Sequence, residues 1–323
     1  MEKPVVYIHR AAKFYTKYMT PANEELLSGF AKIRTPRDRE TPMTYEELVK
    51  DMQGADAILS LNGIGAAEIT TEALQAVQTV KVAAFTHYFA PGCHEIAIPQ
   101  WQKAGVRVID ASDVVSRAVA EWVIGAAILG CLKLDRYDQA LKSGDTWPEW
   151  RGQASMLYRS TFGIAGLGRV GKVVARYIKP FCTNLIGYDR YFSQEEADSL
   201  GIRRVSLHEL LRASDIISLN LPVTEETKGM IGANELSLLK DGAVLINSAR
   251  AAILDKNAFY EELAKNRFTA FLDVFDKEPL AADDPIRTFD NAFITPHIGG
   301  FNNAMFERCG TAGIETLKNY FGM

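Results

Sequence analysis

Short runs of apolar and β-branched residues alternate with segments whose apolar residues recur at helical spacing, almost from one end of the chain to the other. Such alternation predicts parallel sheets with crossover helices. In the first third we expect helices at residues 45–52, 72–77 and 95–104, the last of them ending at Gly105. The strands expected around them are residues 5–8, 57–61, 80–85 and 106–109.

A second series of strands fills most of the remaining chain. Its members are residues 162–165, 185–188, 216–219, 244–246, 270–274 and 293–295. Strands in this number, separated by helical segments, make a complete doubly wound unit. A long apolar helix, residues 117–134, joins the two series, and residues 303–320 form a further helix with regular apolar spacing.

Composition narrows the class of protein. The 323 residues predict about two domains, and 47% hydrophobic residues are enough to build sizeable cores. Lysine and arginine number 36 against 40 acidic residues, so we expect neither nucleic acid nor a membrane surface as a partner. The cysteines form no Cys-x-x-Cys pair, and the uncharged apolar run at residues 122–132 is too short to span a bilayer. The apolar run at residues 5–8 is shorter than a signal peptide needs, so we expect it to be a strand. We therefore expect a cytoplasmic protein without a metal site.

The first strong motif is a glycine-rich turn directly after the strand at residues 162–165. Gly166, Gly168 and Gly171 give the pattern Gly-x-Gly-x-x-Gly at the start of a helix. The first glycine allows the tight turn, the second lets the backbone approach a pyrophosphate, and the third lets the helix pack close to the strand. The N–H groups at the helix N-terminus favour an anion, so the motif predicts a dinucleotide site. The ordinary alternative is a glycine-rich turn without a ligand.

Asp189 ends the next strand of the series. A carboxylate at this place can accept hydrogen bonds from an adenosine ribose diol, and it would repel a 2′-phosphate. We therefore expect NAD(H) in preference to NADP(H). Two readings weaken this expectation: the adjacent Arg190 can neutralise the charge, and an aspartate here can simply lie on the surface.

Three further segments follow the carboxyl ends of later strands, where open α/β sheets bind their ligands. They are Asn-Ser-Ala-Arg at residues 247–250, Asp-Val-Phe-Asp-Lys-Glu-Pro at residues 273–279 and Pro-His-Ile-Gly-Gly at residues 296–300. Together with the glycine motif, this arrangement resembles the D-2-hydroxyacid dehydrogenase family, which includes D-lactate dehydrogenases, phosphoglycerate dehydrogenases and glyoxylate/hydroxypyruvate reductases. The resemblance covers essentially the full chain and is most specific from residue 116 onward.

The resemblance implies a catalytic triad of Arg250, Glu278 and His297. An arginine offers a two-pronged grip on a carboxylate, and a histidine can supply a proton near neutral pH. Glu278 would orient the imidazole, and Asp273 would hold the nicotinamide carboxamide. Each residue also has an ordinary structural reading, and only their joint order at the strand ends favours the catalytic one.

The resemblance also implies the surroundings of the cofactor and the mode of assembly. Cofactor contacts are expected from the turns after the strands of the second series: Gly166, Gly168, Arg169, Val170, Gly171, Asp189, Leu221, Pro222, Thr227, Ser248, Ala249, Arg250, Asp273, His297, Gly299 and Gly300. The helix at residues 117–134 is apolar on too many faces for a solvated helix. A homodimer through this helix is expected, and burial inside one chain is the alternative.

The segment that usually holds the substrate departs from the family pattern. A glycine-rich loop of the form Gly-x-Gly-x-Asp-Asn-Ile-Asp is usual, whereas residues 90–97 read Ala-Pro-Gly-Cys-His-Glu-Ile-Ala. Pro91 has no N–H to donate to a carboxylate. We expect substrate contacts from Asn62, Gly63, Pro91, Gly92 and Arg250, and the identity of the acid stays open.

These observations predict an α/β protein. A Rossmann doubly wound parallel-sheet cofactor domain, residues 116–299, is inserted into a smaller flavodoxin-like α/β substrate domain, residues 1–115 plus 300–323. The expected activity is that of an NAD-dependent D-2-hydroxyacid dehydrogenase, or 2-ketoacid reductase, acting on a small acid. Two alternatives stay open: formate-dehydrogenase-like hydride oxidation without proton transfer, and an NAD(H)-binding sensor that keeps the fold without useful catalysis.

Overall fold

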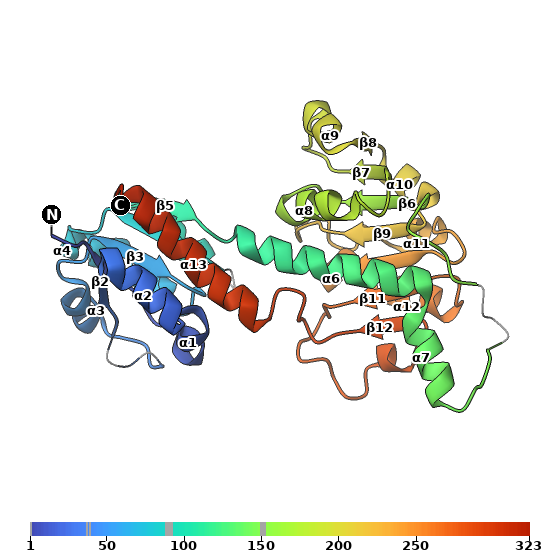
Figure 1. Ribbon diagram of the computed structural model, residues 1–323, viewed down its shortest axis with the longest axis horizontal. Helices are drawn as coiled ribbons and strands as arrows, with labels where there is room; N and C mark the ends of the chain where they lie inside the picture. The colour runs from blue at the N-terminus through green and yellow to red at the C-terminus, as the bar shows by residue number, and fades with distance from the viewer. Residues whose placement is uncertain (1, 37, 39, 88–92, 149–152) are drawn as a thin grey trace. The chain divides into compact units, whose positions relative to one another are not determined.

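The structure is a computed structural model that describes residues 1–323 except 1, 37, 39, 88–92 and 149–152. The chain forms two compact units, whose elements are labelled in Figure 1. The first unit comprises Met1–Val115 and Phe301–Met323, and the second comprises Ser116–Gly300. Gly300, which we expected in the first domain, therefore belongs to the second unit.

A parallel sheet of five strands forms the centre of the first unit, in the order β2-β1-β3-β4-β5. Val6 in the first strand pairs with Ile33 on one side and with Ala57 on the other. This strand order is the flavodoxin-like one predicted from the sequence. The strands are β1 (Val5–Tyr7), β2 (Lys32–Arg34), β3 (Ala57–Ser60), β4 (Val82–Phe85) and β5 (Arg107–Asp110).

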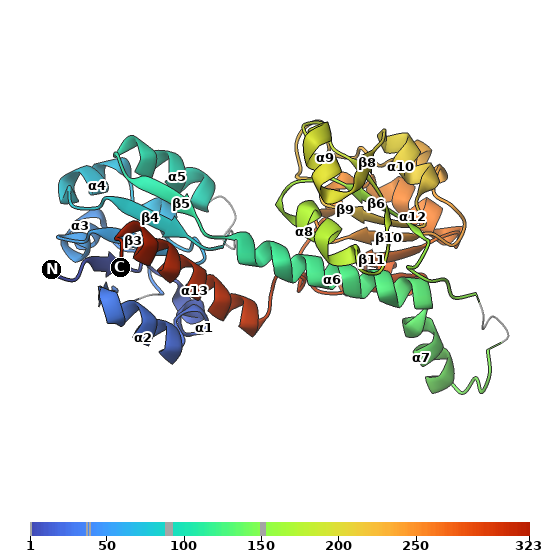
Figure 2. The ribbon, with the colours of Figure 1, turned by 45° about the horizontal axis from the view of Figure 1, so that its top comes forward.

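Helices pack against this sheet (Figure 2). Three of them, α3, α4 and α5, bury Leu48, Leu74 and Trp101 in one apolar cluster with Ile58 of the sheet. Because neighbouring residues of a strand point to opposite faces of the sheet, the side chain of Leu59, next to Ile58 in β3, lies on the opposite face. The helical elements are η1 (Ala12–Phe14), α1 (Tyr15–Tyr18), α2 (Pro21–Phe30), α3 (Tyr45–Met52), η2 (Ala66–Glu68), α4 (Thr71–Val77), α5 (Cys93–Lys103) and α13 (Asn303–Tyr320).

The C-terminal helix α13 completes the first unit. A Cβ atom at Gly310 would collide with the backbone oxygen of Tyr18, and one at Gly313 would lie 2.6 Å from Leu59. Glycine at these two positions therefore lets α13 lie directly against α1 and β3. The last helix of the chain shares a core with the first strands, which explains why the first unit is discontinuous.

A parallel sheet of seven strands forms the centre of the second unit, in the order β12-β11-β10-β9-β6-β7-β8. The order reverses at β6, whose neighbours are β7 and β9, and open sheets of this kind bind ligands at such a switch point. The strands are β6 (Thr161–Ala165), β7 (Asn184–Tyr188), β8 (Ile202–Arg204), β9 (Ile216–Leu219), β10 (Val244–Asn247), β11 (Thr269–Leu272) and β12 (Ala292–Ile294). The predicted Rossmann fold is confirmed.

Helices enclose the second sheet in two apolar clusters. One cluster joins α6, α8 and α9 to the sheet, and the other joins α10, α11 and α12 to it. The helical elements are α6 (Asp113–Leu132), α7 (Leu134–Lys142), α8 (Arg169–Ile178), α9 (Gln194–Leu200), α10 (Leu207–Ala213), α11 (Ala233–Ser237), η3 (Ala251–Ile253), α12 (Lys256–Ala264) and η4 (Pro285–Thr288).

The long helix α6 differs from its prediction. It ends at Leu132, because Lys133 adopts a left-handed backbone conformation (φ +52°), and α7 begins at the next residue. By length and composition alone α6 is apolar enough to cross a membrane, a test that the core helix of a soluble protein also passes. Val123 and Ala127 of this helix are buried in the core of the second unit.

Two strands lie outside those that the sequence predicts. Both are at an edge of their sheet, and each has only three residues: β2 reads Lys-Ile-Arg and β8 reads Ile-Arg-Arg. Two charges among three residues hide the apolar signal of a strand. As a result the second sheet has seven strands where six were predicted.

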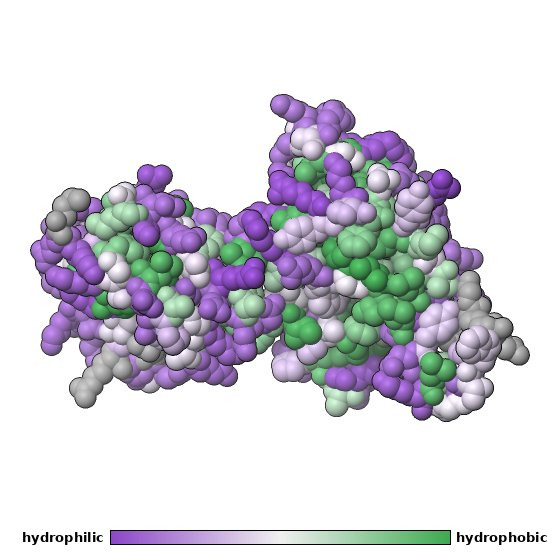
Figure 3. All heavy atoms as spheres, viewed as in Figure 1, coloured by the Kyte–Doolittle hydropathy of each residue, from purple (hydrophilic) through white to green (hydrophobic). Residues whose placement is uncertain are grey.

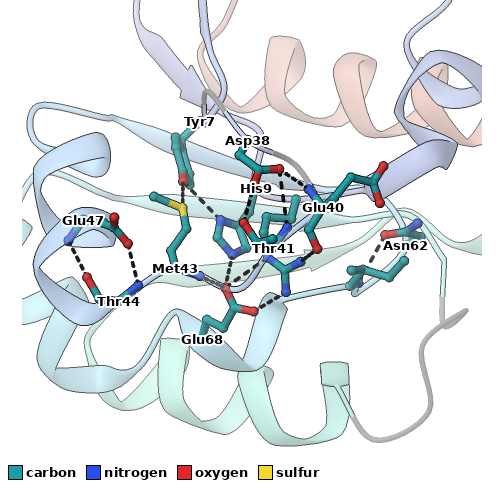
Figure 4. A network of polar contacts seen from close by, with 12 residues as sticks. Tyr7, His9, Asp38, Glu40, Thr41, Met43, Thr44, Glu47, Asn62 and Glu68 are labelled. Atoms are coloured by element: carbon teal, nitrogen blue, oxygen red, sulfur yellow. Dashed lines mark hydrogen bonds and ion pairs between the residues drawn. The ribbon is translucent and has the colours of Figure 1, made fainter.

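A polar network lies at the carboxyl end of β1 in the first unit (Figure 4). Glu68 accepts hydrogen bonds from the guanidinium of Arg10 and contacts His9 Nε2 at 3.1 Å, and Arg10 also donates to the backbone oxygen of Glu40 at 2.8 Å. Burial on its own would raise the pKa of Glu68. The hydrogen bonds from His9 and Arg10 outweigh that effect and lower the pKa from 4.5 to about 2. The ionised carboxylate thus joins β1 to η2.

Glu68→Gln should destabilise the first unit at pH 7 by on the order of 3 kcal/mol, because Arg10 would lose its anionic partner in a site where its side chain is 7% exposed. A carboxyl group with a lowered pKa stabilises the fold fully above its ordinary pKa of 4.5 and loses this contribution as the pH falls towards about 2. Urea unfolding should therefore show a difference between parent and variant that is largest near neutral pH and shrinks below pH 4.5. Glu25→Gln, at an exposed position of α2, is the matched control. A pH-independent difference would contradict this account of Glu68.

Candidate active site

The glycine-rich turn between β6 and α8 has the geometry that its pattern predicts. Gly166 has a φ of +92°, and a Cβ atom there would lie 2.7 Å from the backbone of Asn220. A Cβ atom at Gly171 would collide with the backbone oxygen of Gly166, so this glycine fixes the packing of α8 against the turn. At Gly168 a Cβ atom would meet nothing within 4 Å. Of the three glycines of the motif, only Gly168 has free space at its Cβ position. It directly precedes the N-terminus of α8, where a helix favours an anion.

Asp189 follows β7 directly and is held by two backbone groups. Its Oδ2 accepts a hydrogen bond from the N–H of Leu167 at 2.8 Å, and its Oδ1 accepts one from the N–H of Tyr191 at 2.8 Å. The first of these bonds ties the aspartate to the glycine-rich turn. The carboxylate is thus fixed beside the glycine-rich turn, and its contact with an adenosine ribose stays a prediction.

Two buried polar atoms at the carboxyl ends of neighbouring strands have no hydrogen-bond partner among the residues that the structure describes. They are the side-chain oxygen of Asn220, after β9, and the hydroxyl of Ser248, after β10. Buried polar groups are nearly always paired, so each of these atoms suits a ligand that supplies the missing partner. Ser248 is among the cofactor residues expected from the sequence, whereas Asn220 is not. The donors and acceptors present here fit a dinucleotide.

The loop after β9 carries three further residues of the predicted cofactor set. Leu221 is buried, and Pro222 is exposed. The hydroxyl of Thr227 donates to the backbone oxygen of Pro222 at 2.6 Å, and its backbone N–H donates to Thr224 Oγ1 at 3.2 Å. These bonds hold the loop in a compact turn. Arg169 and Val170, also predicted, form the first residues of α8.

Arg250 stands on the turn after β10. Asn247, which is fully buried, donates a side-chain hydrogen bond to the backbone oxygen of Arg250 at 3.0 Å and accepts one from the N–H of Ala249 at 3.1 Å. The exposed guanidinium donates to the backbone oxygen of Ala249 at 2.6 Å, which leaves its other N–H groups for a ligand. Asn247 is therefore a positioning residue that the sequence analysis missed, although its place next to Ser248 and Arg250 was a usable signal.

His297 and Glu278 lie together, as predicted. His297 Nδ1 and Glu278 Oε2 are 2.7 Å apart, and the other carboxylate oxygen accepts the backbone N–H of Phe275 at 3.0 Å. Burial would raise the pKa of Glu278, but the hydrogen bonds from His297 and Phe275 outweigh it and lower the pKa, with a further contribution from the charge of Arg250. Glu278 is thus held as a carboxylate on Nδ1. Nε2, the other ring nitrogen, then remains for proton exchange with a ligand.

Asp273 holds the loop that carries His297. Its side chain is buried and accepts hydrogen bonds from the hydroxyl of Thr295 at 2.5 Å and from the backbone N–H groups of Ile298 and Gly299 at 2.8 and 2.7 Å. His297 has a φ of +54°, a left-handed conformation that residues other than glycine adopt at a cost. The bonds on either side of His297 therefore stabilise it in this conformation. Both oxygens of Asp273 accept hydrogen bonds within the protein, and its contact with the nicotinamide carboxamide stays a prediction.

The predicted substrate residues of the first unit are described in part. Asn62 is buried and uses its side chain on the backbone: it donates to the oxygen of Ala11 at 3.3 Å and accepts from the N–H of Ile64 at 3.2 Å. Gly63 follows with a φ of +78°. Pro91 and Gly92 lie outside the described residues.

Asp273→Asn should destabilise the second unit by about 1–3 kcal/mol, because the amide group would point donors at backbone donors. Urea unfolding checks the stability. Hydrogen exchange checks the cause, since the amides of Ile298 and Gly299 should exchange faster than in the parent. Asp283→Asn, at an exposed position, is the control. Unchanged exchange at these two amides would show that the carboxylate does not hold the loop.

The family model and the similar proteins point to the same family. The model of the D-isomer specific 2-hydroxyacid dehydrogenase NAD binding domain matches residues 124–299. The chain is 32% identical over 280 residues to a D-3-phosphoglycerate dehydrogenase of Methanocaldococcus jannaschii, covering 86% of this chain and 52% of that protein. It is also 32% identical over 315 residues to a glyoxylate reductase of Aeropyrum pernix, covering 95% of this chain and 92% of that protein.

The fold is shared with solved structures. One is an acyclic imino acid reductase in complex with NADPH and D-Arg, which is 22% identical and covers 99% of this chain and 97% of that one with a TM-score of 0.71. The chain spans about half the length of the phosphoglycerate dehydrogenases that it matches, 52% and 56% in two of them. The family match, extending over more than half of the sequence, confirms the resemblance drawn from the strand-end motifs. The chain belongs to the D-isomer specific 2-hydroxyacid dehydrogenase family.

Proposed function

We propose that this chain is an NAD(H)-dependent 2-ketoacid reductase, or D-2-hydroxyacid dehydrogenase, acting at C2 of a small acid. The observation that carries the proposal is the contact between His297 and Glu278. These two residues and Arg250 follow the carboxyl ends of neighbouring strands of the second sheet. A histidine with one nitrogen held by a carboxylate, next to an arginine, is the set of groups that reduction of a ketoacid requires.

Each member of the triad has a separate task. Bound NADH supplies the hydride. Arg250 binds the carboxylate of the acid and polarises the carbonyl oxygen through charged N–H groups. His297 gives its Nε2 proton to that oxygen during reduction and takes it back during oxidation. Glu278 keeps the imidazole in the required orientation and compensates its positive charge. Asp273 and Asn247 position His297 and Arg250 through the backbone.

In this proposal the second unit binds the cofactor. The glycine-rich turn would hold the pyrophosphate, Asp189 the adenosine ribose, and Asn220 and Ser248 further polar groups of the cofactor. Asn62 and Gly63 would act on the substrate through their backbone, because the Asn62 side chain is already bonded. We further propose a cytoplasmic enzyme that prefers NAD(H) to NADP(H) and binds neither nucleic acid nor membranes.

Two alternatives predict different chemistry. Formate-dehydrogenase-like oxidation needs no proton transfer, so an ionised partner such as Glu278 on the histidine would have no function. A sensor would need the dinucleotide site but not the triad. The 2.7 Å contact between His297 and Glu278 therefore favours the ketoacid reductase.

The test is turnover of a panel of small 2-keto acids with NADH and NADPH, followed by absorbance of the reduced nicotinamide, together with turnover of formate with NAD. We expect reduction of at least one 2-keto acid with NADH. Arg250→Ala should lower kcat/KM by about 100-fold or more, while NADH binding, followed by fluorescence, stays within a few-fold of the parent. Tight NADH binding without turnover of any acid would favour the sensor, and oxidation of formate alone would favour the other alternative.

We also propose that two copies of the chain form a homodimer through α6 and α7. Helix α7 has no buried residue, although it carries apolar ones. Leu134 and Leu141 on it are 45% and 56% exposed, and Trp147 after it is 68% exposed. Figure 3 shows hydrophobic side chains gathered on the second unit in the region of α6. Apolar groups in this number on one side of a unit are typical of an interface. We choose a second copy of the chain as the partner, because exposed apolar side chains follow α6 directly along α7 and the segment after it.

Light scattering should give twice the mass of one chain. The double variant Leu141→Glu and Trp147→Glu should shift the mass towards that of one chain, because charges would enter the interface. Phe181→Glu, a similarly exposed position just beyond α8, should leave the mass unchanged. A parent chain that stays monomeric at micromolar concentrations would exclude the dimer.

A further inference from the structure

An ion pair lies beside the proposed adenosine end of the cofactor site. Arg190 directly follows Asp189, and its Nη1 donates a hydrogen bond to Glu226 Oε2. The two residues come from the segments after β7 and β9, the strands on either side of β6. Their side chains are 63% and 62% exposed, so solvent and ligands can reach both.

Within the part of the chain that the structure describes, the ion-pair partner of Arg190 is Glu226 rather than the adjacent Asp189. Each oxygen of Asp189 already accepts a backbone N–H, from Leu167 and from Tyr191. The hydrogen bond and charge of Glu226 instead raise the pKa of Arg190 above its ordinary value. The guanidinium is thus directed to the loop after β9 by Glu226.

Glu226 is presented from a turn that is itself well held. The hydroxyl of Thr227 accepts the N–H of Thr224 at 2.8 Å and donates to the oxygen of Pro222 at 2.6 Å. A short distance along the chain, the N–H of Gly229 donates to the oxygen of Ala252 at 2.8 Å. The carboxylate therefore stands at a defined place opposite Arg190.

An arginine beside the ribose carboxylate is the kind of residue that binds a 2′-phosphate, since its planar N–H groups match phosphate oxygens. With Glu226 in place, the charge of Arg190 is offset by a carboxylate that is hydrogen-bonded to it, so the guanidinium attracts a 2′-phosphate less strongly. We propose that Glu226 is a specificity-determining residue that restrains Arg190 and selects against a 2′-phosphorylated dinucleotide. This inference rests on the proposed cofactor site.

Binding of half-cofactors tests the inference without any turnover. Calorimetry with 5′-AMP and with 2′,5′-ADP compares ligands that differ only by the 2′-phosphate. In Glu226→Gln the affinity for 2′,5′-ADP should rise about two- to fivefold at low ionic strength, the size expected for breaking an exposed ion pair. The affinity for 5′-AMP should stay unchanged, and the gain for 2′,5′-ADP should shrink as salt is added.

Two further variants show whether Arg190 carries the effect. In the double variant Arg190→Gln and Glu226→Gln, the gain for 2′,5′-ADP should largely disappear, because the gain depends on the released guanidinium. Glu209→Gln breaks another exposed ion pair of the second unit, with Arg203, and should change neither affinity.

The outcomes separate this inference from the proposed function. Equal changes for both ligands in Glu226→Gln, or a gain that persists without Arg190, would overturn the role of Glu226 and leave the cofactor site intact. Failure of 5′-AMP and NADH to bind the parent chain would refute the cofactor site itself, and the role of Glu226 with it.

Discussion

One buried carboxylate, that of Asp273, joins the end of β11 to the loop after β12 through hydrogen bonds from Thr295, Ile298 and Gly299. A carboxylate that accepts several N–H and O–H groups is held more firmly than a neutral acceptor in the same place. The left-handed backbone of His297 lies between these bonds, and its contact with Glu278 depends on that backbone. The position of His297 thus depends on a carboxylate that is itself buried.

The glycine-rich turn and the contact between His297 and Glu278 were predictable because each residue type is tied to a local requirement. A positive φ at Gly166 and the close approach at Gly171 admit little else than glycine, and strand ends collect polar residues at one edge of a parallel sheet. The edge strands β2 and β8 were not predictable, since their charges mask the pattern. The pairing of Arg190 with Glu226 joins residues far apart in sequence, and the internal use of Asp273 depends on the path of a loop. Such contacts arise only when the tertiary fold brings the segments together.

The polar groups at the carboxyl edge of the second sheet fall into two kinds. Asp189 and Asp273 have both oxygens bonded to the protein, so their geometry is set before any ligand binds. Among the described residues, Asn220 and Ser248 each keep a buried polar atom without a partner. A buried polar group without a hydrogen-bond partner destabilises the fold, and proteins keep such groups mainly at functional sites. The site thus combines fixed acceptors with groups whose pairing a dinucleotide would complete.

The packing of α13 against α1, made possible by Gly310, also bears on how the protein is made. A ribosome releases residues in order, and domains generally fold as units during synthesis. All segments of the second unit, Ser116–Gly300, have emerged before any residue of α13 does. The first unit is begun first and finished last, so the part of β3 that α13 covers stays exposed until the final helix has been made.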